Sequence, residues 1–213
     1  MNPADVAAFE RCIADSGVAL FPADTVYGLA VDPVSPEAVD RLYALKGRPQ
    51  DRPAAVMFFS LEPALALLTE LGPRTRAAAE ALLPGAVTLV LPNPAGRFPL
   101  ACGPEPQRLG IRVPRFEGPL APLTAVSAPV LQSSANRTGG PEARTLAGVD
   151  PRVRAGVDLE LDGGELLGTA STVVDLSGYE RAGSFAVTRE GAVPAIEVLA
   201  ALRAAGAGTV KPQ

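Results

Sequence analysis

Residues 18–28 read VALFPADTVYG, and the change of character at Pro22 decides how the chain begins to fold. The run Val18–Phe21 is apolar and of strand length, which predicts a short buried strand. Proline has no backbone N–H, so this strand ends at Pro22. Before it, residues 3–15 are predicted to form a helix, because Asn2 is a good N-cap and Pro3 suits the first helical position.

The rest of the chain mixes strand and helix patterns without strict alternation. Apolar, β-branched runs predict further buried strands at 54–59, 86–91, 109–113, 130–134, 157–161, 171–176 and 185–190. Capping residues and helical periodicity predict one helix that begins at residue 36 and further helices over 61–70, 73–83 and 194–205. The Pro-rich stretch 92–106 is predicted to be a surface loop or flap. This order favours an α/β fold, a twisted, open, mixed sheet flanked by helices, as a single domain over 1–205 with a C-terminal tail over 206–213.

The composition is that of a globular protein with an acidic balance. Of 213 residues, 47% are hydrophobic and 20% charged, which suffices for one buried core. The formal net charge of -4 argues against a main task in non-specific nucleic-acid binding, because such binding neutralises phosphates. No charged-then-apolar leader and no apolar run of membrane-spanning length is found, so we expect a cytoplasmic protein that does not contact a membrane.

The chain contains no histidine, which excludes several kinds of catalytic and metal site. Ser-His-Asp triads, Cys-His dyads and His-bearing metal sites all need an imidazole. The two cysteines, Cys12 and Cys102, are not in a CxxC spacing, so we expect reduced thiols. A reaction suits this chain if its nucleophile arrives with the substrate and its barrier falls by positioning and charge neutralisation.

Polar residues gather at four places where predicted strands or helices end, and open α/β sheets tend to bind ligands at strand ends. These places are Pro22–Gly28, Lys46–Pro49, Ser133–Asn136, and Ser171–Asp175 together with Thr188–Gly191. Each has an ordinary structural explanation as a turn, a cap or a solvated strand end, so none of them decides a function by itself.

The second of these segments predicts an anion site. Gly47 can end the preceding helix, and the proline after Arg48 biases that residue toward an extended conformation. Residues two apart in an extended segment share a face, so Lys46 and Arg48 are predicted to clamp one polyanion from exposed positions in a cleft. Ser134 and Asn136 repeat the spacing. We expect the two segments to lie on opposite sides of one anion-lined cavity.

Read in order, PADTVYGLA, KGRP, PGAVTLVL, LGIRVP, SSAN, STVVD and TREGAV resemble the YrdC-type family of threonylcarbamoyl-AMP synthases, from about Leu20 to Val193. The resemblance implies the YrdC-like sheet with a concave, basic site. It also implies a nucleotidyltransferase, an L-threonylcarbamoyladenylate synthase that joins L-threonine, bicarbonate and ATP, with Mg²⁺ bound alongside the nucleotide, and releases pyrophosphate. The product serves the threonylcarbamoyladenosine modification of tRNA, so contact with tRNA or with the transfer complex is expected.

The resemblance assigns roles to nine residues. The expected catalytic residues are Lys46 and Arg48, which match the family's KxR pair. The expected ATP-binding residues are these two with Ser134, Asn136 and Arg189. The expected threonine-binding residues are Thr25, Tyr27, Arg112 and Ser171, with Arg112 on the carboxylate. The resemblance does not assign a metal ligand.

Two departures from the family pattern bear on the choice of amino acid. Position 23 is Ala where the family commonly reads PTDT, and residues 54–56 read AAV near a position where many members carry a His. Two other functions stay open. One is an RNA- or tRNA-binding module of the same fold without catalysis, for which the arginine-rich segments 108–115 and 137–154 leave room. The other is a related enzyme that uses a different amino acid.

Overall fold

The computed structural model describes residues 1–206 and 211–212. These residues form one ten-stranded sheet in the order β10-β9-β8-β4-β5-β3-β6-β2-β1-β7. The strands are β1 (Ala19–Pro22), β2 (Tyr27–Val31), β3 (Ala55–Met57), β4 (Val87–Pro92), β5 (Arg108–Arg112), β6 (Val130–Ser134), β7 (Leu159–Glu160), β8 (Thr172–Asp175), β9 (Ser184–Arg189) and β10 (Lys211–Pro212). The helices are α1 (Pro3–Ala14), α2 (Pro36–Lys46), α3 (Leu61–Leu67), α4 (Pro73–Leu82), α5 (Pro99–Cys102), α6 (Pro151–Arg154), α7 (Tyr179–Ala182), α8 (Ala195–Ala204) and the 3₁₀ helices η1 (Gly118–Ala125) and η2 (Leu146–Gly148).

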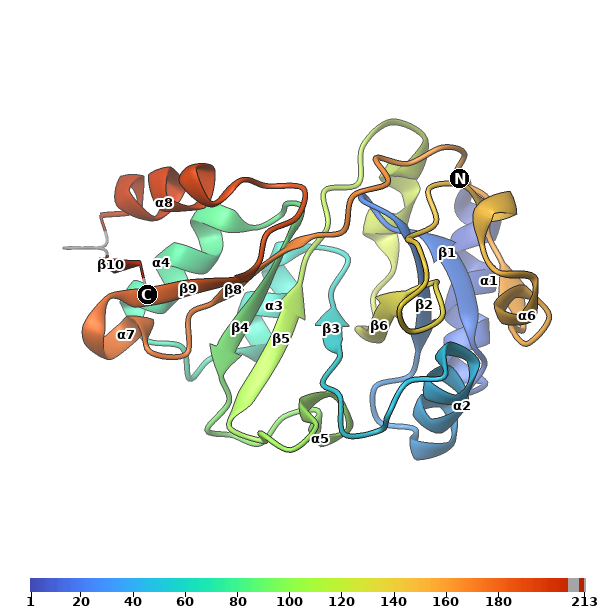
Figure 1. Cartoon of the computed structure of the whole chain (residues 1–213), viewed down its shortest axis with the longest axis horizontal. Helices are drawn as coiled ribbons and strands as arrows, with labels where there is room; N and C mark the ends of the chain where they lie inside the picture. The colour runs from blue at the N-terminus through green and yellow to red at the C-terminus, as the bar shows by residue number, and fades with distance from the viewer. Residues whose placement is uncertain (207–210, 213) are drawn as a thin grey trace.

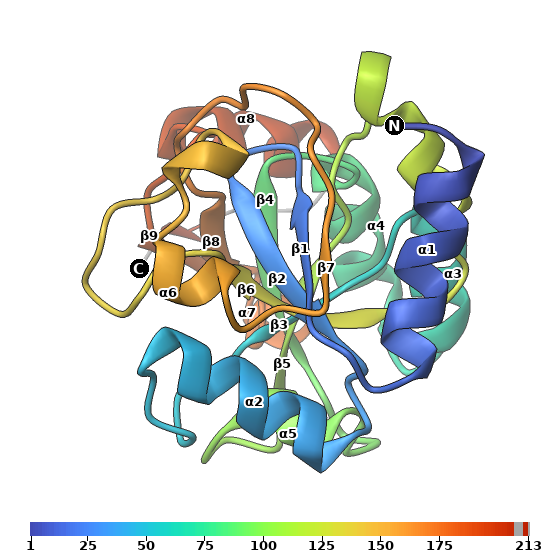
Figure 2. The same ribbon diagram turned by 90° about the vertical axis from the view of Figure 1, so that its right-hand side faces the viewer.

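The sheet is mixed, which confirms the predicted fold class. The pairs β1–β7, β3–β5, β4–β8 and β9–β10 are parallel, and the pairs β1–β2, β2–β6, β3–β6, β4–β5 and β8–β9 are antiparallel. Helices α1, α3 and α4 lie on one side of the sheet, and the loop between β6 and α6 lies on the other (Figure 1 and Figure 2). None of the helices in the described residues is long and apolar enough to cross a bilayer.

Aromatic side chains pack the first helix onto the sheet. The ring of Phe9 in α1 lies 5.2 Å from that of Phe21 in β1 and 5.4 Å from that of Phe59, centroid to centroid. Phe59 in turn stacks on Phe116 at 5.8 Å. All four rings are buried, and aromatic rings remove large apolar areas from water. The predicted strand at Val18–Phe21 is therefore held in place by the predicted helix before it.

Helix ends are confirmed where capping residues predict them. The Asn2 side chain accepts hydrogen bonds from backbone N–H groups in the first turn of α1. Ser35 caps α2 in the same way. Gly47 ends α2 in the left-handed conformation, with a φ of 56°, which suits a glycine at this position.

Other elements differ from the expectation. Only Leu159–Glu160 pair as β7 where 157–161 is predicted, and their partners in β1 are Ala19 and Leu20. Helix α3 stops at Leu67, before the predicted end at 70. Of the predicted tail 206–213, residues 207–210 and 213 lie outside the described residues. Lys211–Pro212 pair with β9.

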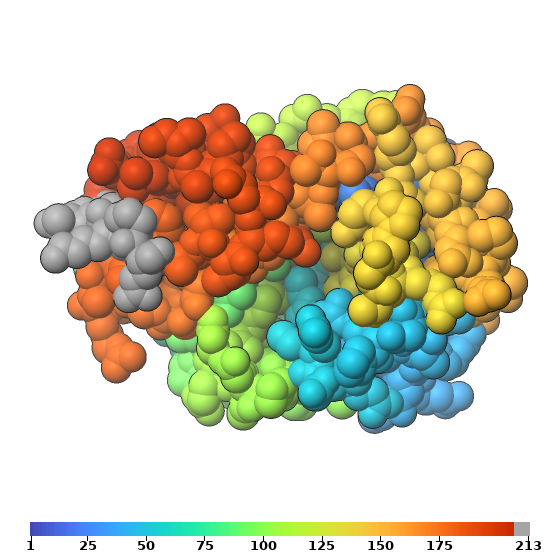
Figure 3. Space-filling model, in the orientation of Figure 1, coloured from blue at the N-terminus to red at the C-terminus, as the bar shows by residue number. Residues whose placement is uncertain are grey.

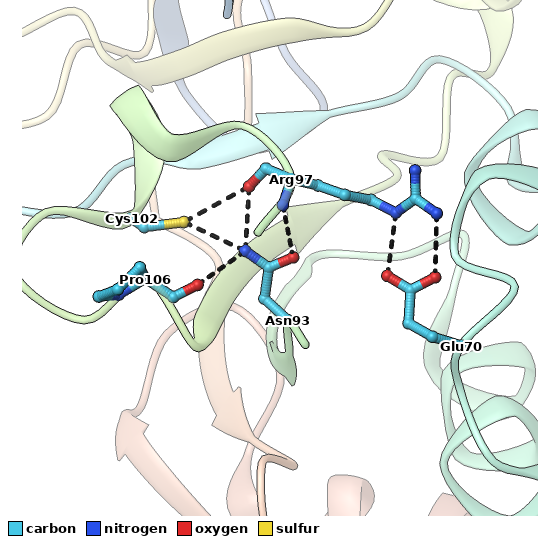
Figure 4. Close-up of polar contacts among 5 residues, drawn as sticks. All are labelled: Glu70, Asn93, Arg97, Cys102 and Pro106. Carbon is cyan, nitrogen blue, oxygen red and sulfur yellow. Dashed lines mark hydrogen bonds and ion pairs between the residues drawn. The ribbon is translucent and has the colours of Figure 1, made fainter. Parts of the chain in front are cut away.

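One asparagine fastens the predicted loop 92–106 (Figure 4). Asn93 is 1% exposed, and its Nδ2 donates to the carbonyls of Arg97 at 3.0 Å and Pro106 at 2.9 Å. Its Oδ1 accepts the N–H of Arg97 at 2.9 Å. Arg97 also forms a two-point ion pair with Glu70, at 2.9 and 3.2 Å. The loop is thus tied to itself and to the turn between α3 and α4.

Replacing Asn93 by alanine leaves buried backbone groups without partners. We expect Asn93→Ala to lower the free energy of unfolding by about 2–3 kcal/mol, since an unsatisfied buried polar group costs about 1–3 kcal/mol. Urea unfolding followed by circular dichroism measures this change. Asn2→Ala is the control, because it removes an exposed cap and should cost only about 1 kcal/mol. Equal losses in the two variants would contradict the fastening role of Asn93.

Candidate functional site

A cavity of about 300 Å³ opens on one face of the sheet, across β3, β4, β5, β6, β8 and β9. The space-filling view shows the surface hollowed between the C-terminal elements and the loop after β6 (Figure 3). The charged residues of the lining are Arg48, Arg108, Arg112, Arg189, Glu105 and Glu142. Arginines outnumber glutamates here although the whole chain carries a net charge of -4. The cavity is therefore a local basic site, as predicted.

The end of α2 is hydrogen-bonded to the turn after β6. Lys46 is the last residue of α2, and its ammonium group donates to the backbone carbonyls of Ser134 and Asn136, the latter at 2.7 Å. The N–H of Thr138 donates back to the Lys46 carbonyl at 2.8 Å. The two segments are thus in contact on one side of the cavity, which corrects the expectation that they face each other across it.

Lys46 is 3% exposed and does not line the cavity, which corrects the expectation of an exposed clamp. The reason is that the carbonyl oxygens after β6 draw the ammonium group inward. Burial, and then the charge of Arg48, lowers the pKa of Lys46 to about 8, while the carboxylate of Glu142 acts in the opposite direction. Lys46 therefore orders one wall of the site without lining it.

Arg48 does line the cavity. Its guanidinium group lies over the ring of Tyr43 at 5.7 Å, and it donates to Ser133 Oγ at 3.2 Å and to the carbonyl of Pro53. Burial lowers the pKa of Arg48. Among the described residues it forms no ion pair, and its buried Nε has no hydrogen-bond partner. Arg48 thus keeps a charge and a donor for an anionic ligand.

Ser134, the last residue of β6, is joined to Asn136 in the turn that follows. Ser134 Oγ lies 2.6 Å from Asn136 Oδ1, and Asn136 Nδ2 donates to the carbonyl of Gly140 at 2.6 Å. Ser134 is part of the cavity lining, whereas Asn136 is not. The asparagine is placed to hold the serine and the following loop.

Strands β8 and β9 bring two more predicted residues to the cavity. Ser171 Oγ lies 2.9 Å from Thr88 Oγ1 of β4. Arg189 donates from Nη2 to the carbonyl of Ser171 at 2.8 Å and to its hydroxyl at 3.3 Å. Burial lowers the pKa of Arg189, and no carboxylate among the described residues pairs with it. Arg189 is the second lining arginine whose charge is available.

Gly191 allows this close packing of β8 and β9. A Cβ at this position would lie 2.2 Å from the carbonyl oxygen of Ala170 and 2.7 Å from the carbonyl carbon of Ser171. The N–H of Gly191 donates to Thr172 Oγ1 at 2.9 Å. The turn after β9 therefore requires a residue without a side chain, and this turn sets Arg189 beside Ser171.

Arg112 lines the cavity but is already paired. It forms a buried ion pair with Asp24, whose side chain is 9% exposed, and it also donates to Thr25 Oγ1. Thr25 itself does not line the cavity. The Nε of Arg112 is buried and has no hydrogen-bond partner among residues 1–206 and 211–212. This Nε–H donor is therefore left for a ligand.

Tyr27 lies outside the cavity lining. Its hydroxyl oxygen lies 2.9 Å from Asp162 Oδ1 and from the carbonyl oxygen of Gly164, and it accepts the N–H of Gly163 at 3.0 Å. Burial raises the pKa of Tyr27 to about 12. The structure thus gives Tyr27 a role in holding residues 162–164.

The cavity includes residues that sequence reasoning missed. Arg108 pairs with Glu105 at 2.7 Å and with Asp175. A signal for it was present, because residues 108, 110 and 112 of one strand share a face and all three line the cavity. Glu142 lies in the loop after β6, where no periodicity marks it.

The donor set of the cavity does not fit a divalent cation held by the protein alone. Within the described residues there is no group of three or more His, Cys, Asp or Glu side chains that could hold a metal ion. Of the two lining glutamates, Glu105 is engaged by Arg108.

Comparisons with known proteins give a family. The Sua5/YciO/YrdC model, described as telomere recombination, matches residues 11–191. The threonylcarbamoyl-AMP synthase of Pyrococcus abyssi is 31% identical over 166 residues, 78% of this chain and 48% of that protein. The threonylcarbamoyl-AMP synthase of Xanthomonas campestris pv. campestris is 33% identical over 161 residues, 75% of this chain and 86% of that protein. The chain thus spans about half of the Pyrococcus relative and most of the Xanthomonas one.

Solved structures share the fold. P. abyssi Sua5 complexed with L-threonine matches with a TM-score of 0.83 at 26% identity, over 100% of this chain and 60% of that one. E. coli YciO matches with a TM-score of 0.73 at 22% identity, over 91% of this chain and 92% of that one. At that identity the YciO match supports the fold alone.

The buried ammonium group of Lys46 predicts a pH-dependent stability. We expect Lys46→Met to lower the free energy of unfolding by about 1–3 kcal/mol, because two carbonyls lose their donor. The pKa of folded Lys46, about 8, lies below the unfolded value, so its charge costs stability at neutral pH and this cost fades as pH rises from about 8. The loss in Lys46→Met should therefore be larger at about pH 9.5 than at pH 7.

Urea unfolding of the wild type and of Lys46→Met at both pH values measures the effect. Arg52→Met is the control, because Arg52 is exposed. A loss that is the same at both pH values would contradict the lowered pKa of Lys46.

Proposed function

Since this chain belongs to the Sua5/YciO/YrdC family, we propose that it is a threonylcarbamoyl-AMP synthase, a nucleotidyltransferase that uses ATP, L-threonine and bicarbonate. The observation that carries the proposal is the pair of lining arginines, Arg48 and Arg189, which have no carboxylate partner in the part of the chain that the structure describes. Two available guanidinium groups in one cavity suit a polyphosphate.

The reaction needs charge neutralisation more than a protein nucleophile. The amine of threonine attacks the carbon of bicarbonate, and an oxygen of the resulting carbamate attacks the α-phosphate of ATP and expels pyrophosphate. Negative charge develops on phosphate oxygens, and Arg48 and Arg189 stabilise it in the cavity. The absence of histidine is no obstacle, because the nucleophile belongs to the substrate.

The remaining predicted residues position these groups. Lys46 holds the turn that carries Ser134, and the serine hydroxyl, which donates to Asn136 Oδ1 in this structure, would turn to a phosphate oxygen when ATP binds. Arg112 is fixed by Asp24 and Thr25, and its Nε suits the carboxylate of threonine.

We expect Mg²⁺ to enter with the phosphates of ATP. Mg²⁺ usually keeps several waters and binds substrate phosphates, and the described residues offer no group of three or more His, Cys, Asp or Glu side chains, so the phosphates are expected to be its main ligands. When bound, the ion adds its charge to that of the arginines.

The alternative of an RNA-binding module without catalysis is not favoured. In the arginine-rich segment 108–115, Arg108 and Arg112 are held by Asp175 and Asp24, so their charges are not available to a phosphate backbone. Contact with tRNA or with the transfer complex, and a cytoplasmic location, remain part of the proposal. The two departures from the family pattern differ in where they lie. Ala54 and Ala55 line the cavity, whereas residue 23 does not. The departure at 54–56 is therefore the one that bears on which amino acid the site binds.

Pyrophosphate release tests the activity. With ATP and bicarbonate, the protein should release pyrophosphate when threonine is added, and less with valine or serine. Arg48→Met and Arg189→Met should each lower the rate by about 10²-fold, as loss of a charge-stabilising donor does in other enzymes. Arg52→Met, an exposed arginine, is the matched control and should keep the wild-type rate. Release that does not depend on an amino acid would refute the proposal.

Ser134→Ala tests whether this serine contacts ATP or threonine. Ser134 lines the cavity next to Ser133, which accepts a hydrogen bond from Arg48, so its loss should raise the KM for ATP about fivefold and leave the KM for threonine nearly unchanged. Ser127→Ala, at an exposed serine, is the control. A larger effect on the KM for threonine would place Ser134 in the other half of the cavity.

A further inference from the structure

Glu142 is a lining carboxylate without a partner in the described residues. The other glutamate of the lining, Glu105, pairs with Arg108 at 2.7 Å. Glu142 forms no ion pair, and its Oε2 atom is buried without a hydrogen-bond partner. A buried polar atom costs free energy unless it forms a hydrogen bond, so Glu142 Oε2 is expected to accept one from a bound ligand.

The backbone on both sides of Glu142 is held in place. The carbonyl of Gly140 accepts a hydrogen bond from Asn136 Nδ2 at 2.6 Å. The carbonyl of Ala143 accepts the N–H of Tyr27 at 2.9 Å. The carboxylate therefore comes from an anchored stretch of the loop after β6, and its position at the cavity is a fixed feature of the site.

Positive charges surround Glu142 without binding it. Its carboxylate raises the pKa values of Lys46, at the end of α2, and of Arg189, in β9, against the larger effect of their burial. Both cations donate to backbone carbonyls, of Asn136 and Ser171 respectively. Arg48, which forms no ion pair among the described residues, lines the same cavity. An acceptor in such a cationic site suits a substrate that brings a positive group as well as negative ones.

We infer that the Glu142 carboxylate binds the ammonium group of the amino-acid substrate and accepts the proton that this group must lose before it can attack. The inference rests on the proposed function. Any other base is hard to find, because the chain has no histidine and Tyr27 lies outside the lining. A positioned carboxylate within reach of the amine is a competent general base.

The step balances with the substrates already named. One N–H bond of the ammonium group breaks and an O–H bond forms on Glu142. The free amine then attacks the bicarbonate carbon, a C–N bond forms, and the C–OH bond breaks as hydroxide leaves with a second amine proton as water. The product is the carbamate anion, and neutral Glu142 returns its proton to solvent after the products leave.

A second role for the same carboxylate would be to keep Lys46 protonated, and pH separates the two roles. If Glu142 accepts the proton, its loss matters most at low pH, where little threonine arrives as free amine, and matters less as pH rises. If it only supports Lys46, its loss has no effect where Lys46 is protonated anyway and grows as pH rises toward the pKa of Lys46, about 8.

The experiment compares wild type, Glu142→Gln and Glu165→Gln in the pyrophosphate assay between about pH 6 and pH 9. Glu165 pairs with Arg144 and is exposed, so Glu165→Gln is the matched control and should keep the wild-type rate. Glu142→Gln should lower kcat/KM for threonine by about 10²-fold near pH 7, leave the KM for ATP unchanged, and recover as pH rises. Glu142→Asp should retain part of the activity.

Three outcomes would overturn the inference: a deficit that grows with pH, a deficit that is equal at every pH, or a rise in the KM for ATP alone. A wild-type rate in Glu142→Gln would do the same. If the wild type itself shows no threonine-dependent release, the proposed function fails. That case is recognised because the wild type and Glu165→Gln are then both inactive. The thermal midpoint of Glu142→Gln should not fall, since an unbound buried carboxylate is removed.

Discussion

The buried ammonium group of Lys46 is the contact on which the rest of the site depends. A buried charge is tolerated only when it is hydrogen-bonded, and here the partners are the carbonyls of Ser134 and Asn136. Because Lys46 ends α2, one cation joins the end of that helix to the end of β6. The turn so fixed carries a lining serine and leads into the loop of Glu142. Lys46 therefore holds one wall of the cavity in place, although its own side chain does not line the cavity.

The distribution of charge in the cavity follows a simple division. Arg112 and Arg108 are paired with Asp24 and Asp175, which fixes them in the walls, and Arg112 keeps its Nε donor for a ligand. Arg48 and Arg189 rest on backbone carbonyls, which position a guanidinium group without cancelling its charge. An acidic protein can thus keep a small anion site, and the net charge of the chain does not describe its binding cavity.

Local sequence signals predicted the fold well because caps and apolar runs act over a few residues, as Asn2, Ser35 and Gly47 show. The site was predicted in part. Arg48 and Arg189, which the resemblance assigns to ATP, both line the cavity, whereas Lys46, which the sequence pattern predicts to be exposed, is buried. It is in fact the last helical residue, and only the tertiary pairing with β6 buries it. Glu142 had no pattern to reveal it, because a loop position acquires meaning only from what packs around it.

The absence of a side chain at Gly191 has a consequence for how this sequence can diverge. The neighbouring carbonyl of Ala170 occupies the space that a Cβ would need, so the codon for this glycine has few viable replacements. Substitution is therefore restricted at a position that does not line the cavity, two residues after an arginine that does. Which residues are tolerated at position 191 would depend on the space that the neighbouring backbone leaves, and not on contact with a substrate.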